Sequence, residues 1–133
     1  MTAVFADTFY FLALLNRGDL SHQRAVASSQ VPGLRLVTTD LVMLELADAL
    51  CKVDHRQDAM AIWELLETDE SIELVEVTRR VLHQGRELYA TRADKDWPLT
   101  DCVSFVVMSS RGLSEALTAD RHFEQAGFRA LLA

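Results

Sequence analysis

The segment TDCVSFVVMSSRG, residues 100–112, predicts a buried helix near the centre of the fold. Thr100 and Asp101 supply polar groups at its start, and residues 102–110 are apolar on nearly every side. Gly112 stands where a left-handed residue commonly ends a helix. Because a helix that is apolar nearly all round packs inside a protein, we expect this one to be central.

Outward from this helix, short apolar runs alternate with segments of helical periodicity. The expected strands are residues 4–6, 34–37, 72–77, 116–119 and 128–132. The expected helices are 9–15, 22–29, 41–53, 56–67, 79–93, 102–110 and a brief one that begins after Asp120 and ends at Gly127. This alternation predicts an α/β fold with a mainly parallel sheet of about four to five short strands and helices on both faces. We expect residues 1–133 to form one such domain.

Composition narrows the class of protein. The 133 residues include 13 Lys and Arg against 20 Asp and Glu, a net charge of −7, and 50% are hydrophobic. The apolar run 9–15 is far shorter than the roughly 20 residues that span a bilayer, which excludes a transmembrane protein. The N-terminus has no basic segment and meets Asp7 almost at once, unlike a secretory signal. We therefore expect a cytoplasmic protein without membrane segments.

Several kinds of catalytic or metal motif are absent. Cys51 and Cys102 lie inside apolar helical patterns and form no C-x-x-C pair, so both are expected to be buried and reduced. There is no Gly-rich phosphate loop, no G-x-S-x-G and no H-E-x-x-H. The histidines are scattered and are interpreted as surface or packing residues: His22, His55, His83 and His122.

Three acidic residues are predicted to gather at one edge of the sheet. Asp7 follows the first expected strand, Asp120 follows the fourth, and Asp101 starts the central helix. In an open parallel sheet, ligand sites lie outside the carboxyl ends of the strands, where these turns collect. Taken singly, each carboxylate is better explained as a helix-capping or first-turn residue.

Glu45 is not explained in this way, because it interrupts the apolar run LVMLELA, residues 41–47, inside a predicted helix. A carboxylate rarely lies in such surroundings without a partner. Either it faces solvent beside Asp48 and Lys52, or it shares a cation with the other acids. Clustered carboxylates suit Mg²⁺ or Mn²⁺, which relieve their mutual repulsion and assist phosphodiester hydrolysis.

Four features together resemble a PIN domain, in particular the VapC-type toxins of bacterial and archaeal toxin–antitoxin pairs. They are Asp7-Thr8 after the first strand, Glu45 in the helix after the second, LTDCVSF at 99–105 and LTADRHFEQAGF at 117–128. The resemblance covers essentially the whole chain, and the four acids occur in the family's order.

The resemblance implies a Mg²⁺- or Mn²⁺-dependent endoribonuclease whose catalytic, metal-binding residues are Asp7, Glu45, Asp101 and Asp120. Asp7 and Asp101 would be the principal ligands, Glu45 a ligand or an orienter of water, and Asp120 a ligand of a second or more loosely held ion. Neighbouring groups either support this site or serve as turn hydroxyls and a solvated loop charge: Thr8, Asp96 and Thr118.

The resemblance also implies single-stranded or loop RNA as substrate, a homodimer, and a cognate antitoxin whose segment blocks the acidic pocket. A PIN-type RNA-processing nuclease without a toxin role and an inactive PIN-like binding module remain alternatives. The charge of −7 suits an RNA-binding surface poorly unless basic residues gather locally. Candidate phosphate contacts are Arg17, Arg24, Arg79, Arg80, Arg86, Arg92, Lys95, Arg121 and Arg129, of which Arg121 is the strongest by position. Trp97 could stack on a base, but we expect it to pack in the core.

Overall fold

Five short strands form the centre of the computed structural model, which describes residues 3–133. They are β1 (Ala3–Ala6), β2 (Arg35–Thr39), β3 (Ile72–Val75), β4 (Glu115–Leu117) and β5 (Arg129–Ala130). All pair in parallel in the order β3-β2-β1-β4-β5, so β1 is central, and Phe5 of β1 lies opposite both Val37 and Ala116. The carboxyl ends of β1, β2 and β4 therefore meet at one edge of the sheet.

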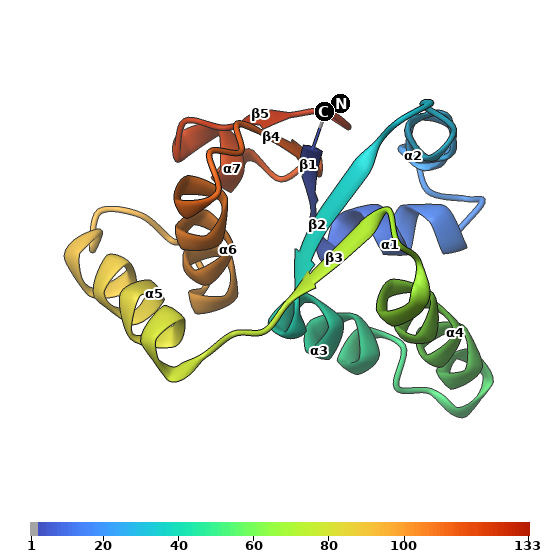
Figure 1. Cartoon of the computed structure of the whole chain (residues 1–133), viewed down its shortest axis with the longest axis horizontal. Coiled ribbons are helices and arrows are strands. Elements are labelled where there is room, and N and C mark those ends of the chain that lie inside the picture. Colours follow the sequence, from blue (N-terminus) through green and yellow to red (C-terminus); the bar gives the residue numbers. More distant parts are fainter. Residues whose placement is uncertain (1–2) are drawn as a thin grey trace.

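Helices cover both faces of this sheet. They are α1 (Thr8–Leu15), α2 (His22–Ser29), α3 (Asp40–Ala49), α4 (Arg56–Thr68), α5 (Arg79–Thr91), α6 (Leu99–Ser110) and α7 (Arg121–Gln125), with a short 3₁₀ turn η1 (Val53–His55). Figure 1 shows α5 and α6 on one side of the sheet and α1, α2 and α4 on the other. The predicted fold class is confirmed. None of the helices within residues 3–133 has the length and apolar character needed to cross a membrane.

Helix α6 is the central helix that its sequence predicts. Seven of its twelve residues are buried, including Asp101 and Phe105. The ring of Phe105 lies 5.0 Å from that of Phe123 on α7 and 5.0 Å from that of Trp97, edge to face in both cases. Trp97 is only 5% exposed, which confirms that it packs in the core. These aromatic contacts fix the start of α6 against α7.

Several helix ends differ from their predictions: α5 ends at Thr91 rather than at residue 93, and α6 begins at Leu99 rather than at residue 102. The end of α3 also differs, and this changes the surroundings of a cysteine. Helix α3 ends at Ala49 instead of continuing to Val53. The side chain Nε of Arg56 donates a 2.7 Å hydrogen bond to the carbonyl of Cys51, a group that a longer helix would use internally. Cys51 therefore lies exposed in the connection, and the prediction that it is buried is wrong, whereas Cys102 is buried as expected.

Gly85 allows α5 to approach α6 closely. A Cβ atom at this position would lie 2.5 Å from Cγ2 and 3.1 Å from Cα of Val103. We expect Gly85→Ala to lower the free energy of unfolding by about 1–3 kcal/mol, as overpacking does, despite the better helix propensity of Ala. Urea denaturation measures this change, with Gly18→Ala as the control because its nearest neighbour is a flexible side chain at 3.3 Å. Equal stability of the Gly85 variant and the wild type would contradict the close approach.

Candidate active site

The four acidic residues singled out in the sequence line one cavity of about 310 Å³ at the carboxyl edge of the sheet. Asp7 directly follows β1, Asp120 follows β4, Asp101 lies in the first turn of α6 and Glu45 lies within α3. Thr8 and Pro98 are also part of the wall. The turn geometry of a parallel sheet thus brings together side chains that are as far as 113 residues apart in the chain, from Asp7 to Asp120.

Asp7 is buried, with only 6% of its surface exposed. It precedes α1, yet its side chain makes no capping hydrogen bond to that helix. Instead, Oδ2 accepts a 2.9 Å hydrogen bond from the hydroxyl of Thr118. Burial raises the pKa of Asp7 to about 7, and the negative charge of Asp101 adds to the rise. Helix capping therefore does not account for this carboxylate.

Asp101 lies against a histidine from the neighbouring helix. Nδ1–H of His122 donates to Oδ2 of Asp101 at 3.1 Å, and the same nitrogen lies 3.3 Å from Oδ1 of Asp120. Burial raises the pKa of Asp101 to about 6, opposed by the hydrogen bond from His122 and reinforced by the charge of Asp120. One ligand atom from each of these three residues lies within 4.8 Å of the other two, close enough for a shared metal ion.

Asp120 has two roles in this geometry. Its Oδ1 caps α7 by accepting a 2.9 Å hydrogen bond from the backbone N–H of His122. Its own backbone N–H donates to the hydroxyl of Thr118 at 3.1 Å, so this threonine connects Asp120 to Asp7. The capping prediction is confirmed here, and the carboxylate still faces the cavity.

Glu45 is half-buried and lines the cavity rather than facing solvent with its neighbour Asp48, which is exposed. Its Oε1 accepts a 2.5 Å hydrogen bond from the hydroxyl of Thr8. Because Thr8 is the first residue of α1 and Glu45 lies in the middle of α3, this bond joins the start of α1 to the middle of α3. The solvent-facing alternative for Glu45 is not what the structure shows.

Other predicted neighbours divide into two groups. Thr8 and Thr118 hold carboxylates of the cavity through the hydrogen bonds given above. Arg121 and Asp96 are exposed, and neither lines the acidic cavity. His122 was missed, since it was interpreted as a surface or packing residue. Its only sequence signal is its place two residues after Asp120, at the start of a predicted helix.

The acidic cavity concentrates negative charge. The cavity has four carboxylates in its wall and no Lys or Arg among its described lining residues. Burial, with a further contribution from the neighbouring carboxylates, raises the pKa values of Asp7 and Asp101, so keeping both groups ionised in the cavity costs free energy. Hard divalent cations prefer such carboxylate oxygens, so the residues present fit a divalent metal ion.

The chain belongs to the PIN-domain family, whose pattern it matches over residues 4–129. It is 30% identical over 128 residues to the 23S rRNA-specific endonuclease VapC20 of Mycobacterium tuberculosis, covering 94% of this chain and 95% of that protein. The crystal structure of VapC20, described as a Sarcin-Ricin loop cleaving toxin, superposes with a TM-score of 0.82 at 26% identity, covering 94% of this chain and 95% of that one.

More distant solved structures share the fold. The DNA-bound VapBC of Salmonella typhimurium superposes with a TM-score of 0.67 at 15% identity, covering 98% of this chain and 97% of that chain. VapBC-1 of nontypeable Haemophilus influenzae superposes with a TM-score of 0.67 at 16% identity, covering 99% of this chain and 100% of that chain. The family match and the 30% identity to VapC20 confirm the predicted resemblance to the PIN domains of VapC toxins.

Proposed function

We propose that this protein is a divalent-metal-dependent endoribonuclease that acts as the toxin of a toxin–antitoxin pair. The observation that carries the proposal is the cavity with four carboxylates and no basic side chain among its described lining residues. It lies in a chain that aligns over 94% of its length with an endonuclease specific for ribosomal RNA. Domain 1–133 would then work as one catalytic unit.

In this proposal Asp7 and Asp101 are the principal ligands of Mg²⁺ or Mn²⁺. Glu45 is a further ligand or orients water, and Asp120 is a ligand of a second, more weakly held ion. When bound, a divalent cation lowers the pKa of water and stabilises the negative charge that develops on the phosphate. Thr118 and Thr8 hold the carboxylates of Asp7 and Glu45 through the hydrogen bonds described above. His122 holds Asp101 in the same manner, so the ligands are oriented before substrate arrives.

The role of Glu45 gives the first test of this site. We expect Glu45→Gln to weaken Mn²⁺ binding about tenfold, because the substitution removes one negative charge from the cavity and keeps the shape of the side chain. Isothermal calorimetry measures the affinity. Asp48→Asn is the matched control, because Asp48 is exposed on the same helix and does not line the cavity. Unchanged affinity in Glu45→Gln would remove Glu45 from the ligand set.

The substrate we propose first is ribosomal RNA, because the relative with 30% identity is named for its action on 23S rRNA. The VapBC structures are toxin–antitoxin proteins, so we propose a cognate antitoxin as the protein partner. A basic residue of that antitoxin would fit the acidic cavity by charge. We further propose a homodimer, which light scattering of the purified protein tests, and a cytoplasmic location.

The toxin role is tested by induced expression in a bacterial host. We expect the wild-type chain to arrest growth and to produce new RNA 5′ ends at a few fixed positions. The Asp101→Asn variant, expressed to the same level, should do neither. Fixed RNA cuts without growth arrest would instead indicate the RNA-processing nuclease, and the absence of both would indicate the inactive binding module.

A further inference from the structure

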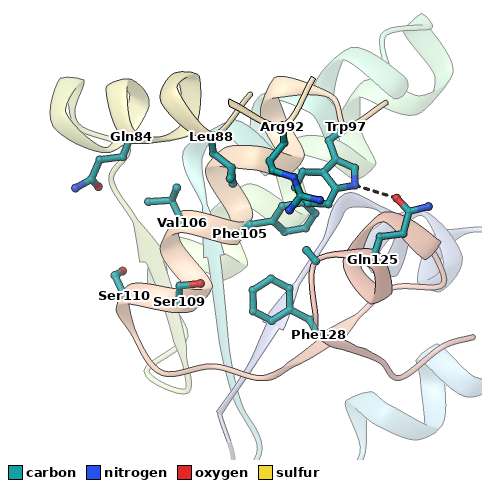
Figure 2. A pocket seen from close by; sticks show the side chains of 11 residues that line it. Gln84, Leu88, Arg92, Trp97, Phe105, Val106, Ser109, Ser110, Gln125 and Phe128 are labelled. Atoms are coloured by element: carbon teal, nitrogen blue, oxygen red, sulfur yellow. Dashed lines mark hydrogen bonds between the residues drawn. The ribbon is translucent and has the colours of Figure 1, made fainter. Parts of the chain in front are cut away.

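A second cavity, of about 590 Å³, lies between α5, α6 and α7, away from the acidic cluster. Figure 2 shows its walls: Arg92 and Trp97 at one end, Phe105 and Val106 from α6, and Gln125 and Phe128 from the segment around α7. We name this cavity the aromatic pocket. Its volume is in the range of pockets that hold small organic ligands.

The chemistry of the aromatic pocket is opposite to that of the acidic cavity. Although the chain has 20 acidic residues, no Asp or Glu is among the described residues that line it. The guanidinium of Arg92 lies 5.0 Å from the centre of the Trp97 ring, and its Nε and Nη2 donate hydrogen bonds of 3.0 and 3.2 Å to the carboxylate of Asp94. Oε1 of Gln125 accepts a 3.0 Å hydrogen bond from Nε1 of Trp97, which fixes this amide with its NH₂ group as a donor. Gln84 lines the opposite wall from α5, with its exposed amide turned away from the other side chains in Figure 2.

The aromatic pocket is connected to the acidic cavity along the surface. A third hollow, of about 800 Å³, shares Arg92 and Trp97 with the aromatic pocket and Pro98 with the acidic cavity. Lys95, Asp96 and the exposed ring of Tyr89 line this intermediate hollow. Along α6, Phe105 in the aromatic pocket is four residues from Asp101, a rise of about 6 Å. One extended polymer could therefore reach both cavities.

We propose that the aromatic pocket binds an unpaired nucleobase of the RNA whose phosphodiester lies at the acidic cavity. This inference rests on the proposed function and adds a base-binding subsite to it. Unpaired bases are recognised by aromatic side chains, by planar guanidinium groups and by hydrogen bonds to their edges. The pocket offers all three, in Phe128, in the guanidinium plane of Arg92 and in the amide of Gln125.

The lining of the aromatic pocket gives a basic antitoxin segment no carboxylate to bind. A Lys- or Arg-rich peptide would find no Asp or Glu among the described residues of this pocket. In the connecting hollow Lys95 is accompanied by Asp96, and Arg92 is paired with Asp94, so the choice of RNA rests on base stacking and amide hydrogen bonds and not on a net positive charge. The acidic cavity, by contrast, suits a basic peptide.

The proposal is tested by filling the pocket with a large side chain. Ser109 is exposed on α6 and lines the pocket, so Ser109→Trp occupies it without disturbing the core. Gln84→Trp fills it from α5, on the facing wall, and serves as a second variant in case the first folds poorly. Ser114→Trp is the matched control, since Ser114 is exposed before β4 and does not line the pocket.

The probes are four fluorescent 12-nucleotide RNAs, each of a single base type, and an abasic ribose-phosphate 12-mer, with binding followed by anisotropy in EDTA. We expect the wild type and Ser114→Trp to bind at least one RNA more than about fivefold more tightly than the abasic chain, the low end for one stacked base. Both pocket-filling variants should lose this preference and bind the abasic chain as before. Equal binding of RNA and abasic chain by the wild type, or an unaltered preference in both filled variants, would overturn the proposal.

Three further outcomes separate this proposal from others. Loss of antitoxin capture in both filled variants, with the base preference kept, would make the pocket a protein-binding site and overturn the proposal. Metal-dependent RNA cleavage without any base preference would overturn the base subsite and leave the nuclease function standing. A base preference that the filled variants lose, in a chain that cuts no RNA, would support the subsite and overturn the nuclease function.

Discussion

Asp101→Asn will lower the rate of RNA cleavage by about 10³-fold or more while leaving the fold intact. The substitution removes a charge at the point where α6, α7 and the acidic cavity meet, and an amide is a poor ligand for a hard cation. Losses of 10²–10³-fold are typical when one preorganised electrostatic group is removed from an active site. Single-turnover cleavage at saturating Mn²⁺ measures the effect.

The fold should survive because the Asp101 charge is itself unfavourable in the metal-free protein, as its raised pKa indicates. Far-ultraviolet circular dichroism and thermal denaturation check this point. Asp54→Asn is the control, since Asp54 is an exposed acid in η1 and lines neither the acidic cavity, the connecting hollow nor the aromatic pocket. Full cleavage activity of Asp101→Asn at matched metal concentration would contradict the assignment of this residue.

The second large effect concerns stability of the metal-free protein as pH changes. In the folded chain the pKa of Asp7 is raised from 3.8 to about 7, so the folded state binds a proton more tightly than the unfolded state. This tighter proton binding by Asp7 adds to the free energy of unfolding. The added stability is complete below about pH 4 and is lost as pH rises through about 7. At 1.36 kcal/mol for each pKa unit, the loss is on the order of 4 kcal/mol at most.

We expect Asp7→Asn to abolish most of this loss, because the asparagine carries no charge at either pH. Urea denaturation in EDTA at pH 5 and pH 8 gives the two free energies of unfolding for each protein. Asp54→Asn, at an exposed carboxylate, controls for the change in net charge. Adding Mn²⁺ at pH 8 should raise the free energy of unfolding of the wild type but not that of Asp7→Asn. Parallel pH profiles for the wild type and Asp7→Asn would show that the buried charge has no such cost.

Much of the fold follows from local signals in the sequence. Thr39 and Thr78 cap α3 and α5 by accepting hydrogen bonds from the N–H groups of Val42 and Val81. Gly112 adopts the left-handed conformation, with φ of +68°, as its place after the central helix predicts. The end of α3 could not be predicted in this way. It depends on a bond from Arg56 to a carbonyl five residues earlier, while the apolar pattern of the sequence continues past it.

The acidic site was predictable in part for a different reason. Asp7 and Asp120 follow strands, and the parallel-sheet rule places such residues at one edge. Glu45 could be found because an ionisable side chain interrupts an apolar helix. His122 could not, because its role depends on how close α7 lies to α6, a contact that joins residues 21 positions apart. The aromatic pocket likewise depends on the packing of three helices and has no local signal.

The most direct test of the nuclease is cleavage of a mixture of transfer and ribosomal RNA by the purified protein. The reaction is run with Mn²⁺ or Mg²⁺, with EDTA, and with Asp7→Asn in the presence of metal. We predict cuts at fixed positions that require the metal and vanish both in EDTA and in the variant. Cuts that persist in EDTA or in Asp7→Asn, or intact RNA under every condition, would contradict metal-dependent hydrolysis at the acidic cavity.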